Sequence, residues 1–112
     1  MKHWILLGAL VAGSAFAHHG WNEYDADKPL QLSGTIEEAG YSHPHGFVQL
    51  KTADKSWMVV LAPPSRMENR GLARDMLKAG TRASVVGYPN RSKPNELRAE
   101  RITIDQKTVE LR

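Results

Sequence analysis

The feature that most constrains the fold is a series of short runs in which apolar and polar residues alternate, separated by turn residues. In the run 30–39 the alternation holds as far as Ile36 and changes phase after Glu37 and Glu38. A period of two is typical of a half-buried strand, and a change of phase predicts a β-bulge that bends the strand. A later run changes phase in the same way near Glu100. Further strands are predicted at 47–51, 57–61, 83–87, 97–104 and, more briefly, 109–111.

A helical segment separates the third run from the fourth. Pro63-Pro64 stops the third strand, and Ser65 followed by Glu68 has the pattern of a capping box at a helix start. The helical pattern continues toward Lys78, but Gly71 predicts a division into two short turns.

Three strands, a short helix and two more strands form the element order of the OB-fold, a small, partly open Greek-key barrel. We therefore predict that residues 30–112 form one all-β domain with a short helix, an OB-like barrel of five to six strands. A small β-sandwich of similar strand number is the alternative. A closed barrel suits a chain without cysteine, because apolar packing rather than disulfides must stabilise it.

Residues 1–17 have the layout of a secretory signal peptide. A basic start at 1–3 precedes the apolar run 4–11, and Ala15-Phe16-Ala17 is a small-x-small cleavage site. The apolar run is shorter than the roughly 20 residues that span a bilayer. We expect a periplasmic or secreted protein with no membrane span after cleavage, in which residues 18–29 form an extended N-terminal arm.

The histidines outside this leader fall in two places. His18 and His19 would begin the processed chain, and His43 and His45 flank Pro44 in a turn. A free α-amine on His18 beside its imidazole resembles the histidine brace of copper monooxygenases. His45 or His43 would add a nitrogen if the arm folds back. Nitrogen donors in a tetragonal arrangement favour Cu(II), and zinc could use the same donors tetrahedrally.

The alternative interpretation of these histidines is that they are ordinary terminal and turn residues that bind nothing. Two aromatic residues lie beside them in sequence, Trp21 and Tyr24. We expect this pair to clamp the arm to the barrel, or to cover a metal site.

A second candidate site is basic. Four cationic residues recur at intervals of four and would form a stripe on one continuous helix: Arg66, Arg70, Arg74 and Lys78. The stripe is either a solvated face or a docking face for an acidic envelope partner or anionic lipid headgroups. Nucleic-acid binding is not expected, because the middle strands carry few aromatic residues and export removes the usual targets.

Enzymatic activity is not expected from the sequence. The chain has no cysteine nucleophile, no Gly-x-Ser-x-Gly elbow and no glycine-rich phosphate loop. Its formal net charge of +3 is too small to imply a polyanionic partner by itself.

Five motifs occur in an order that resembles a known family: His18-His19-Gly20-Trp21, Tyr24-Asp25, Pro44-His45, Pro63-Pro64-Ser65-Arg66 and Leu97-Arg98-Ala99. The family is an uncharacterised one of short exported bacterial proteins, a domain of unknown function. The resemblance covers nearly all of the chain after the leader and implies a periplasmic or secreted single-domain protein. The family pattern has an asparagine where this chain has His43, so the resemblance favours His45 as the shared functional group.

These observations together predict a periplasmic small binding protein that holds copper before zinc. The alternative is a metal-free interaction module that docks through its basic helical face.

Overall fold

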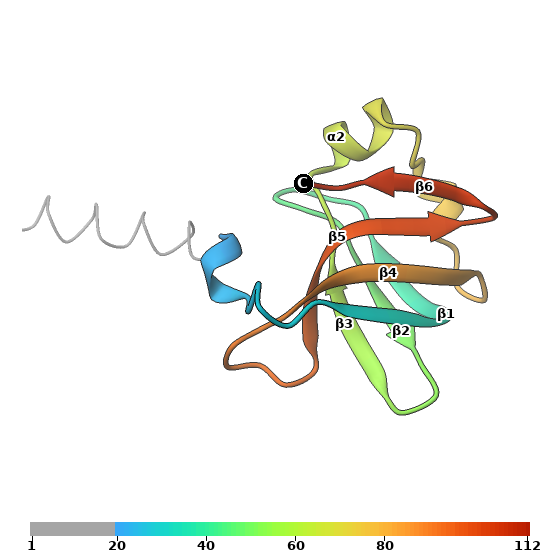
Figure 1. The fold of residues 1–112 in the computed structure, drawn as a ribbon. Coiled ribbons are helices and arrows are strands. Elements are labelled where there is room, and N and C mark those ends of the chain that lie inside the picture. The colour runs from blue at the N-terminus through green and yellow to red at the C-terminus, as the bar shows by residue number, and fades with distance from the viewer. Residues whose placement is uncertain (1–19) are drawn as a thin grey trace, which may run out of the picture.

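The computed structural model describes residues 20–112, so the predicted leader, His18 and His19 lie outside the described part of the chain. Its elements, shown in Figure 1, are η2 (Trp21–Glu23), β1 (Leu30–Gly40), β2 (Phe47–Lys51), β3 (Ser56–Val60), α2 (Pro64–Asn69), η3 (Arg74–Leu77), β4 (Arg82–Pro89), β5 (Glu96–Ile104) and β6 (Lys107–Glu110).

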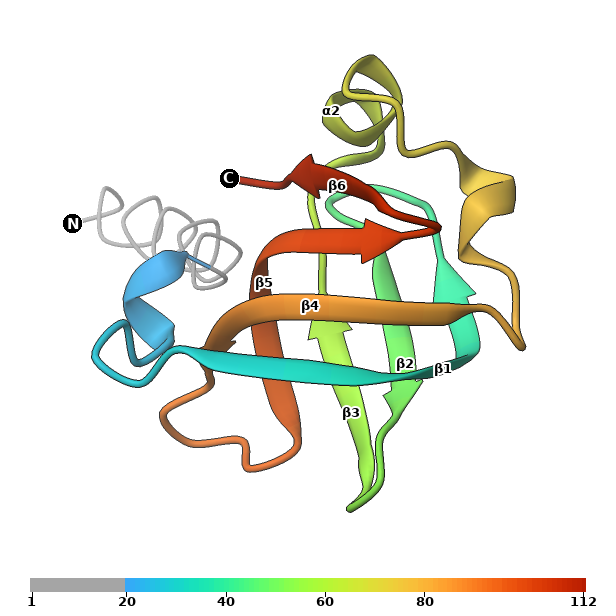
Figure 2. The same cartoon turned by 45° about the vertical axis from the view of Figure 1, so that its right-hand side comes forward.

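The strands of residues 20–112 form a closed OB-like barrel with one added strand. Their order is β3-β2-β1-β4-β5-β6, and a parallel pairing of β3 with β5 closes the barrel. The remaining pairings are antiparallel, and β6 extends the sheet beyond β5. Figure 2 shows the long, bent β1 crossing from β4 to β2. The all-β, OB-like prediction is therefore confirmed.

The two predicted phase changes are the points where the barrel bends. On β1 the pairing with β2 shifts register between Ile36 and Glu38. On β5 the pairing with β4 skips Glu100, because Val86 and Gly87 face residues on either side of it. Such bulges increase local twist and allow one strand to serve two neighbours.

Glycine allows close backbone approach at two strand contacts. A Cβ atom on Gly34 would lie 2.2 Å from the carbonyl oxygen of Lys51, at the point where β1 passes from β4 to β2. A Cβ atom on Gly87 would lie 2.2 Å from the carbonyl oxygen of Arg98, beside the β5 bulge. Real side chains do not tolerate such distances, so these positions require glycine.

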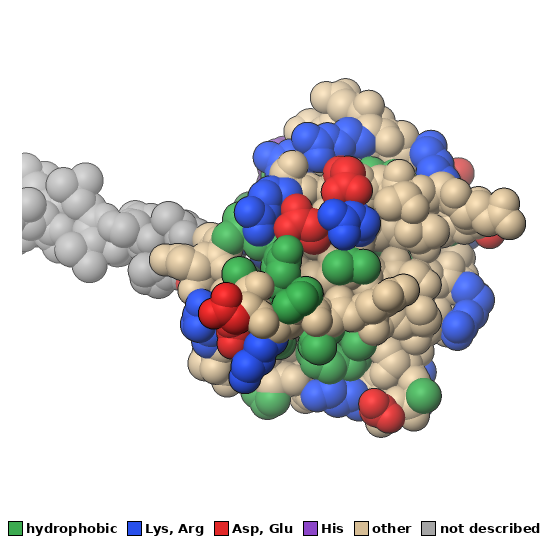
Figure 3. All heavy atoms as spheres, in the orientation of Figure 1, with side chains coloured by type: hydrophobic (Ala, Val, Ile, Leu, Met, Phe, Trp, Pro, Cys, Tyr) green, Lys and Arg blue, Asp and Glu red, His purple; other side chains and the backbone are tan. Residues whose placement is uncertain are grey.

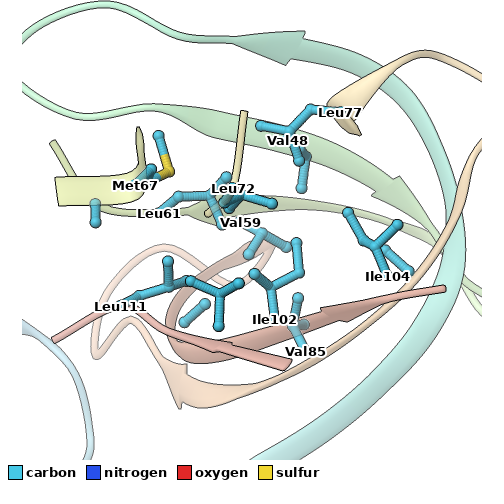
Figure 4. Packing of buried hydrophobic residues seen from close by; sticks show 14 of the residues in the cluster. Val48, Val59, Leu61, Met67, Leu72, Leu77, Val85, Ile102, Ile104 and Leu111 are labelled. Atoms are coloured by element: carbon cyan, nitrogen blue, oxygen red, sulfur yellow. The ribbon is translucent and has the colours of Figure 1, made fainter. Parts of the chain in front are cut away.

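The core fills the barrel and extends under the helical segment. Figure 4 shows Met67 of α2 and Leu72 and Leu77 of the following segment packing against side chains of the strands. All three are at most 2% exposed. The segment between β3 and β4 thus closes one end of the barrel. None of the helices between Gly20 and Arg112 has the length and apolar character that crossing a membrane requires.

The helix start differs from the predicted capping box. The helix begins at Pro64 with Pro63 as its N-cap, and no side chain caps it. Proline has a fixed φ suited to the first helical turn, and its missing N–H needs no partner there. The helix therefore starts at Pro64, two residues before the start at Arg66 that an N-cap at Ser65 would give. Gly71, at φ +90°, separates α2 from η3 as predicted.

Candidate functional site

The N-terminal arm is attached to the barrel by backbone hydrogen bonds. Tyr24 forms an isolated antiparallel bridge with Asn90. The Asp25 amide donates to the Pro89 carbonyl at 2.9 Å, and the Arg91 amide donates to a carbonyl of η2 at 3.0 Å. Residues 20–25 therefore have a defined path along the end of β4 and the connection from β4 to β5.

Tyr24 anchors this path with its side chain. The residue is 1% exposed, and its hydroxyl donates to Oε2 of Glu96 at 2.5 Å. The Asn90 amide donates to the same oxygen at 3.2 Å. Burial, followed by the hydrogen bond to Glu96 and its negative charge, raises the pKa of Tyr24 well above its ordinary value. The phenol therefore stays protonated and acts as a donor.

Trp21 lies against two guanidinium groups. The Cζ atoms of Arg112 and Arg98 are 4.0 Å and 4.4 Å from the centre of its ring. The Tyr88 ring meets it edge-on at a centroid distance of 6.1 Å. Cations over an indole face are attracted by the ring quadrupole, by about 0.5–1 kcal/mol at exposed sites and more when desolvated. Figure 3 shows this side of the molecule, where hydrophobic side chains lie among basic and acidic ones.

The electrostatics around Trp21 are dominated by arginine. Burial lowers the pKa of Arg98, and Arg66 and Arg112 lower it further, whereas Tyr24 and Glu23 act in the opposite direction. Arg112 pairs with a carboxylate of β5 at 3.3 Å. Three guanidinium groups thus act on one another at the base of the arm.

The connection from β1 to β2, residues 41–46, holds His43 and His45. The Gly46 amide donates to the Ala62 carbonyl at 2.9 Å, and the Leu61 amide donates to the Gly46 carbonyl at the same distance. These bonds fix His45 beside the end of β3. The His45 side chain is half-buried, whereas His43 is exposed.

The other end of this connection is fixed by Tyr41. Its hydroxyl donates to the Leu72 carbonyl, and its own carbonyl accepts from Nη2 of Arg74 at 3.2 Å. The connection is therefore held at one end by residues 61 and 62 and at the other end by the helical segment.

Strand pairing brings the histidine turn and the arm to one side of the barrel. Phe47 follows His45 by two residues and is paired with Val60. Val60 is in turn paired with Arg98, which contacts Trp21. Neighbouring strands lie about 4.8 Å apart, so the Cα atoms of Phe47 and Arg98 are about 10 Å apart. The row of paired residues therefore connects the strand that contacts Trp21 to the strand that follows the histidine turn.

Within residues 20–112, no three His, Cys, Asp or Glu side chains gather closely enough to hold a metal ion. The structure brings together His43 and His45 in one turn, and the other two predicted ligands, His18 and His19, lie outside the described residues.

The arginines of the predicted basic stripe each donate to a different backbone carbonyl of the chain. Arg66 donates to the Leu111 carbonyl at 3.0 Å, and Arg70 donates to the Glu110 carbonyl at 2.8 Å. Arg74 binds the start of the β1–β2 connection, and Lys78 is exposed. The break at Gly71 prevents one continuous helical stripe. The three arginines join the helical segment to the barrel, and their use by a partner remains a prediction.

The structure adds three residues to which the sequence analysis assigned no role: Glu96, Arg98 and Arg112. A signal for Arg98 existed, because it lies between the buried residues Leu97 and Ala99 of a strand and must therefore face outward. No sequence signal indicates that Arg112 returns to the arm.

The fold is similar to that of part of TiaS. The structure of TiaS in complex with its transfer RNA and ATP matches with a TM-score of 0.54 and 21% identity, over 80% of this chain and 20% of that one. A ZRD-deleted mutant of TiaS in complex with agmatine matches with the same TM-score and 20% identity, over 79% of this chain and 25% of that one. The chain thus spans a fifth to a quarter of the length of these proteins, and the likeness shows a shared fold.

A search of the curated proteins finds no match to this chain. The family comparison is informative, because residues 7–98 match the sequence profile of DUF6152, and this range contains the arm, the histidine turn and most of the barrel. The chain therefore belongs to DUF6152, a family of unknown function.

Proposed function

We propose that the chain is an exported small binding protein that holds a transition-metal ion, copper in preference to zinc. His18, as the first residue of the processed chain, supplies its α-amine and an imidazole nitrogen. His45 supplies a second imidazole, and His19 and His43 are further donors of the same kind. Amine and imidazole nitrogens suit Cu(II), which also has the highest affinity among the divalent first-row ions.

The observation that carries this proposal is the attachment of the arm. Tyr24 and Trp21 hold residues 20–25 against β4 and β5. Strand pairing through Val60 places this part of β5 two strands away from the end of the histidine turn. A tethered terminus loses less conformational freedom on binding an ion than a free one. The arm therefore supports chelation by two segments that are far apart in sequence.

The position of His45 supports the same assignment. Its loop is fixed by two backbone hydrogen bonds to residues 61 and 62, and its side chain is half-buried rather than fully solvated. The backbone that carries this donor is therefore held in place, and both of its ring nitrogens are covered. His43, which is exposed in the same turn, provides the matched control.

The test is a Cu(II) titration of processed protein beginning at His18, beside the same protein with its α-amine acetylated. Acetylation removes the α-amine from chelation without moving any histidine, and we expect a roughly tenfold or greater loss of affinity, where each tenfold step corresponds to about 1.4 kcal/mol. His45→Ala should weaken binding more than His43→Ala. Affinity should fall as pH drops, because imidazole must be deprotonated to bind. Equal affinity of the two N-terminal forms would reject the proposal.

The second candidate function is a metal-free docking module for an acidic envelope partner. It is supported by the exposure of Arg70, Arg74 and Lys78 on one segment of the chain. The internal bonds of the two arginines to backbone carbonyls weaken it, because docking would compete with them. Protein that takes up no copper in either N-terminal form would favour this candidate.

A further inference from the structure

Three guanidinium groups from different elements converge at the base of the arm: Arg66 of α2, Arg98 of β5 and Arg112 after β6. Arg98 and Arg112 both lie over the ring of Trp21. Arg66 donates to the carbonyl of Leu111, the residue bonded to Arg112. We refer to these three arginines as the arginine cluster.

The charges around the arginine cluster do not cancel. Glu100 pairs with Arg112 at 3.3 Å, and Glu23 is the carboxylate that acts on Arg98. Glu96 is engaged by Tyr24 and lies 4.0 Å from Lys93, so it is already balanced. Three cations with two carboxylates leave one positive charge. Burial, together with the charges of Arg66 and Arg112, lowers the pKa of Arg98.

Two members of the cluster, Arg66 and Arg112, have donors that the contacts above do not use. A guanidinium has five N–H donors. Within residues 20–112, the Arg66 side chain has one hydrogen-bond acceptor, the Leu111 carbonyl. The Arg112 side chain is paired with one carboxylate there, that of Glu100. A planar guanidinium fork matches a carboxylate in a bidentate arrangement, which is stronger than a neutral hydrogen bond.

We propose that the arginine cluster and Trp21 form a binding site for a small organic carboxylate. One negative charge neutralises the excess, and Arg66 and Arg112 provide the donors. The Tyr88 ring provides an apolar surface for the rest of the ligand, whereas the Trp21 ring, over which guanidinium groups already lie, positions the cluster. Arg98 contributes its charge and its contact with the indole ring. The proposal is independent of the metal site, because every residue in it lies within the described chain.

The test uses purified, metal-free protein, so its outcome is separate from that of the copper titration. Acetate and benzoate are added at constant ionic strength while the indole N–H signal of Trp21 is followed by NMR. We expect a saturable shift with a dissociation constant in the millimolar range, and tighter binding of benzoate because its ring meets the Tyr88 ring. Arg66→Gln and Arg112→Gln should each weaken binding at least fivefold.

Arg82→Gln is the matched control, because Arg82 lies at the start of β4, at the other end of the strand from Tyr88, and contacts Thr35. Its loss should leave the affinity unchanged. Thermal melts verify that each variant is folded, and the two cluster variants are independent of each other. The proposal would be overturned if chloride shifted the indole N–H signal as much as acetate does at the same concentration. Tighter binding of inorganic phosphate than of acetate would overturn the assignment to carboxylates, and equal affinities of the cluster variants and the parent protein would overturn the site.

Discussion

Replacing Tyr24 by phenylalanine tests whether the arm is an integral part of the folded domain. The substitution keeps the buried ring and removes only the hydroxyl, which donates to Glu96 at 2.5 Å. The Glu96 side chain is 16% exposed, so water only partly replaces the lost donor. A hydrogen bond to a charged group is worth about 1.5–3 kcal/mol, and we expect a loss of about 2 kcal/mol in the free energy of unfolding.

The assay is chemical denaturation at pH 7 together with a thermal melt. For a domain of this size a loss of about 2 kcal/mol lowers Tm by roughly 8–16 °C. Tyr88→Phe is the matched control, because its hydroxyl donates to Glu100 at a longer distance of 3.1 Å and Glu100 also pairs with Arg112. We expect its loss to be about 1 kcal/mol or less.

Two results would refute this reasoning. A Tyr24→Phe variant within about 0.5 kcal/mol of the parent protein would mean that the arm is not held through Glu96. An equal loss in the Tyr88→Phe variant would mean that any buried or half-buried phenol has the same effect, so that the arm contact is not special.

Three further predictions concern the barrel and its tyrosines. Gly34→Ala should destabilise the domain by about 3 kcal/mol or more, because its Cβ would overlap the Lys51 carbonyl, and denaturation should show this loss. Leu97→Ala removes a side chain that is 0% exposed and should cost about 2–5 kcal/mol in the same assay; a loss below about 1 kcal/mol would contradict the assigned core. Because the pKa of Tyr24 is raised in the folded state, the unfolded state loses its proton first, and stability should fall as pH rises above about 10. This fall should be shallower in Tyr24→Phe, and an identical pH profile for the two proteins would contradict the assigned environment.

The barrel could be predicted because its determinants are local. Period-two alternation located the strands, and the phase changes near Glu37 and Glu100 located the bulges that the register shows. The helix start could not be placed to the residue, because a capping box and Pro64 offered adjacent starts and backbone geometry favoured proline. The order of elements then left few topologies in which all the apolar faces are buried.

The candidate site was less predictable because its contacts are long-range. The aromatic residues of the arm were visible in the sequence, but their partners Glu96, Arg98 and Arg112 lie in β5 and at the C-terminus, at the other end of the chain. The basic residues of the helical segment have the spacing of a surface stripe, yet Arg66 and Arg70 donate to backbone carbonyls near the C-terminus. Residue type and spacing do not distinguish a cation that binds a partner from one that binds the chain's own backbone.

The most direct test of the proposed metal site is native mass spectrometry of protein exported by a cell grown with copper. The measurement reports the first residue of the processed chain and the mass of any bound ion together. We expect a chain that begins at His18 and carries one copper ion, and a His45→Ala variant that loses the ion under the same conditions. A chain processed at another bond, or one that begins at His18 and remains metal-free in the presence of copper, would contradict the proposal.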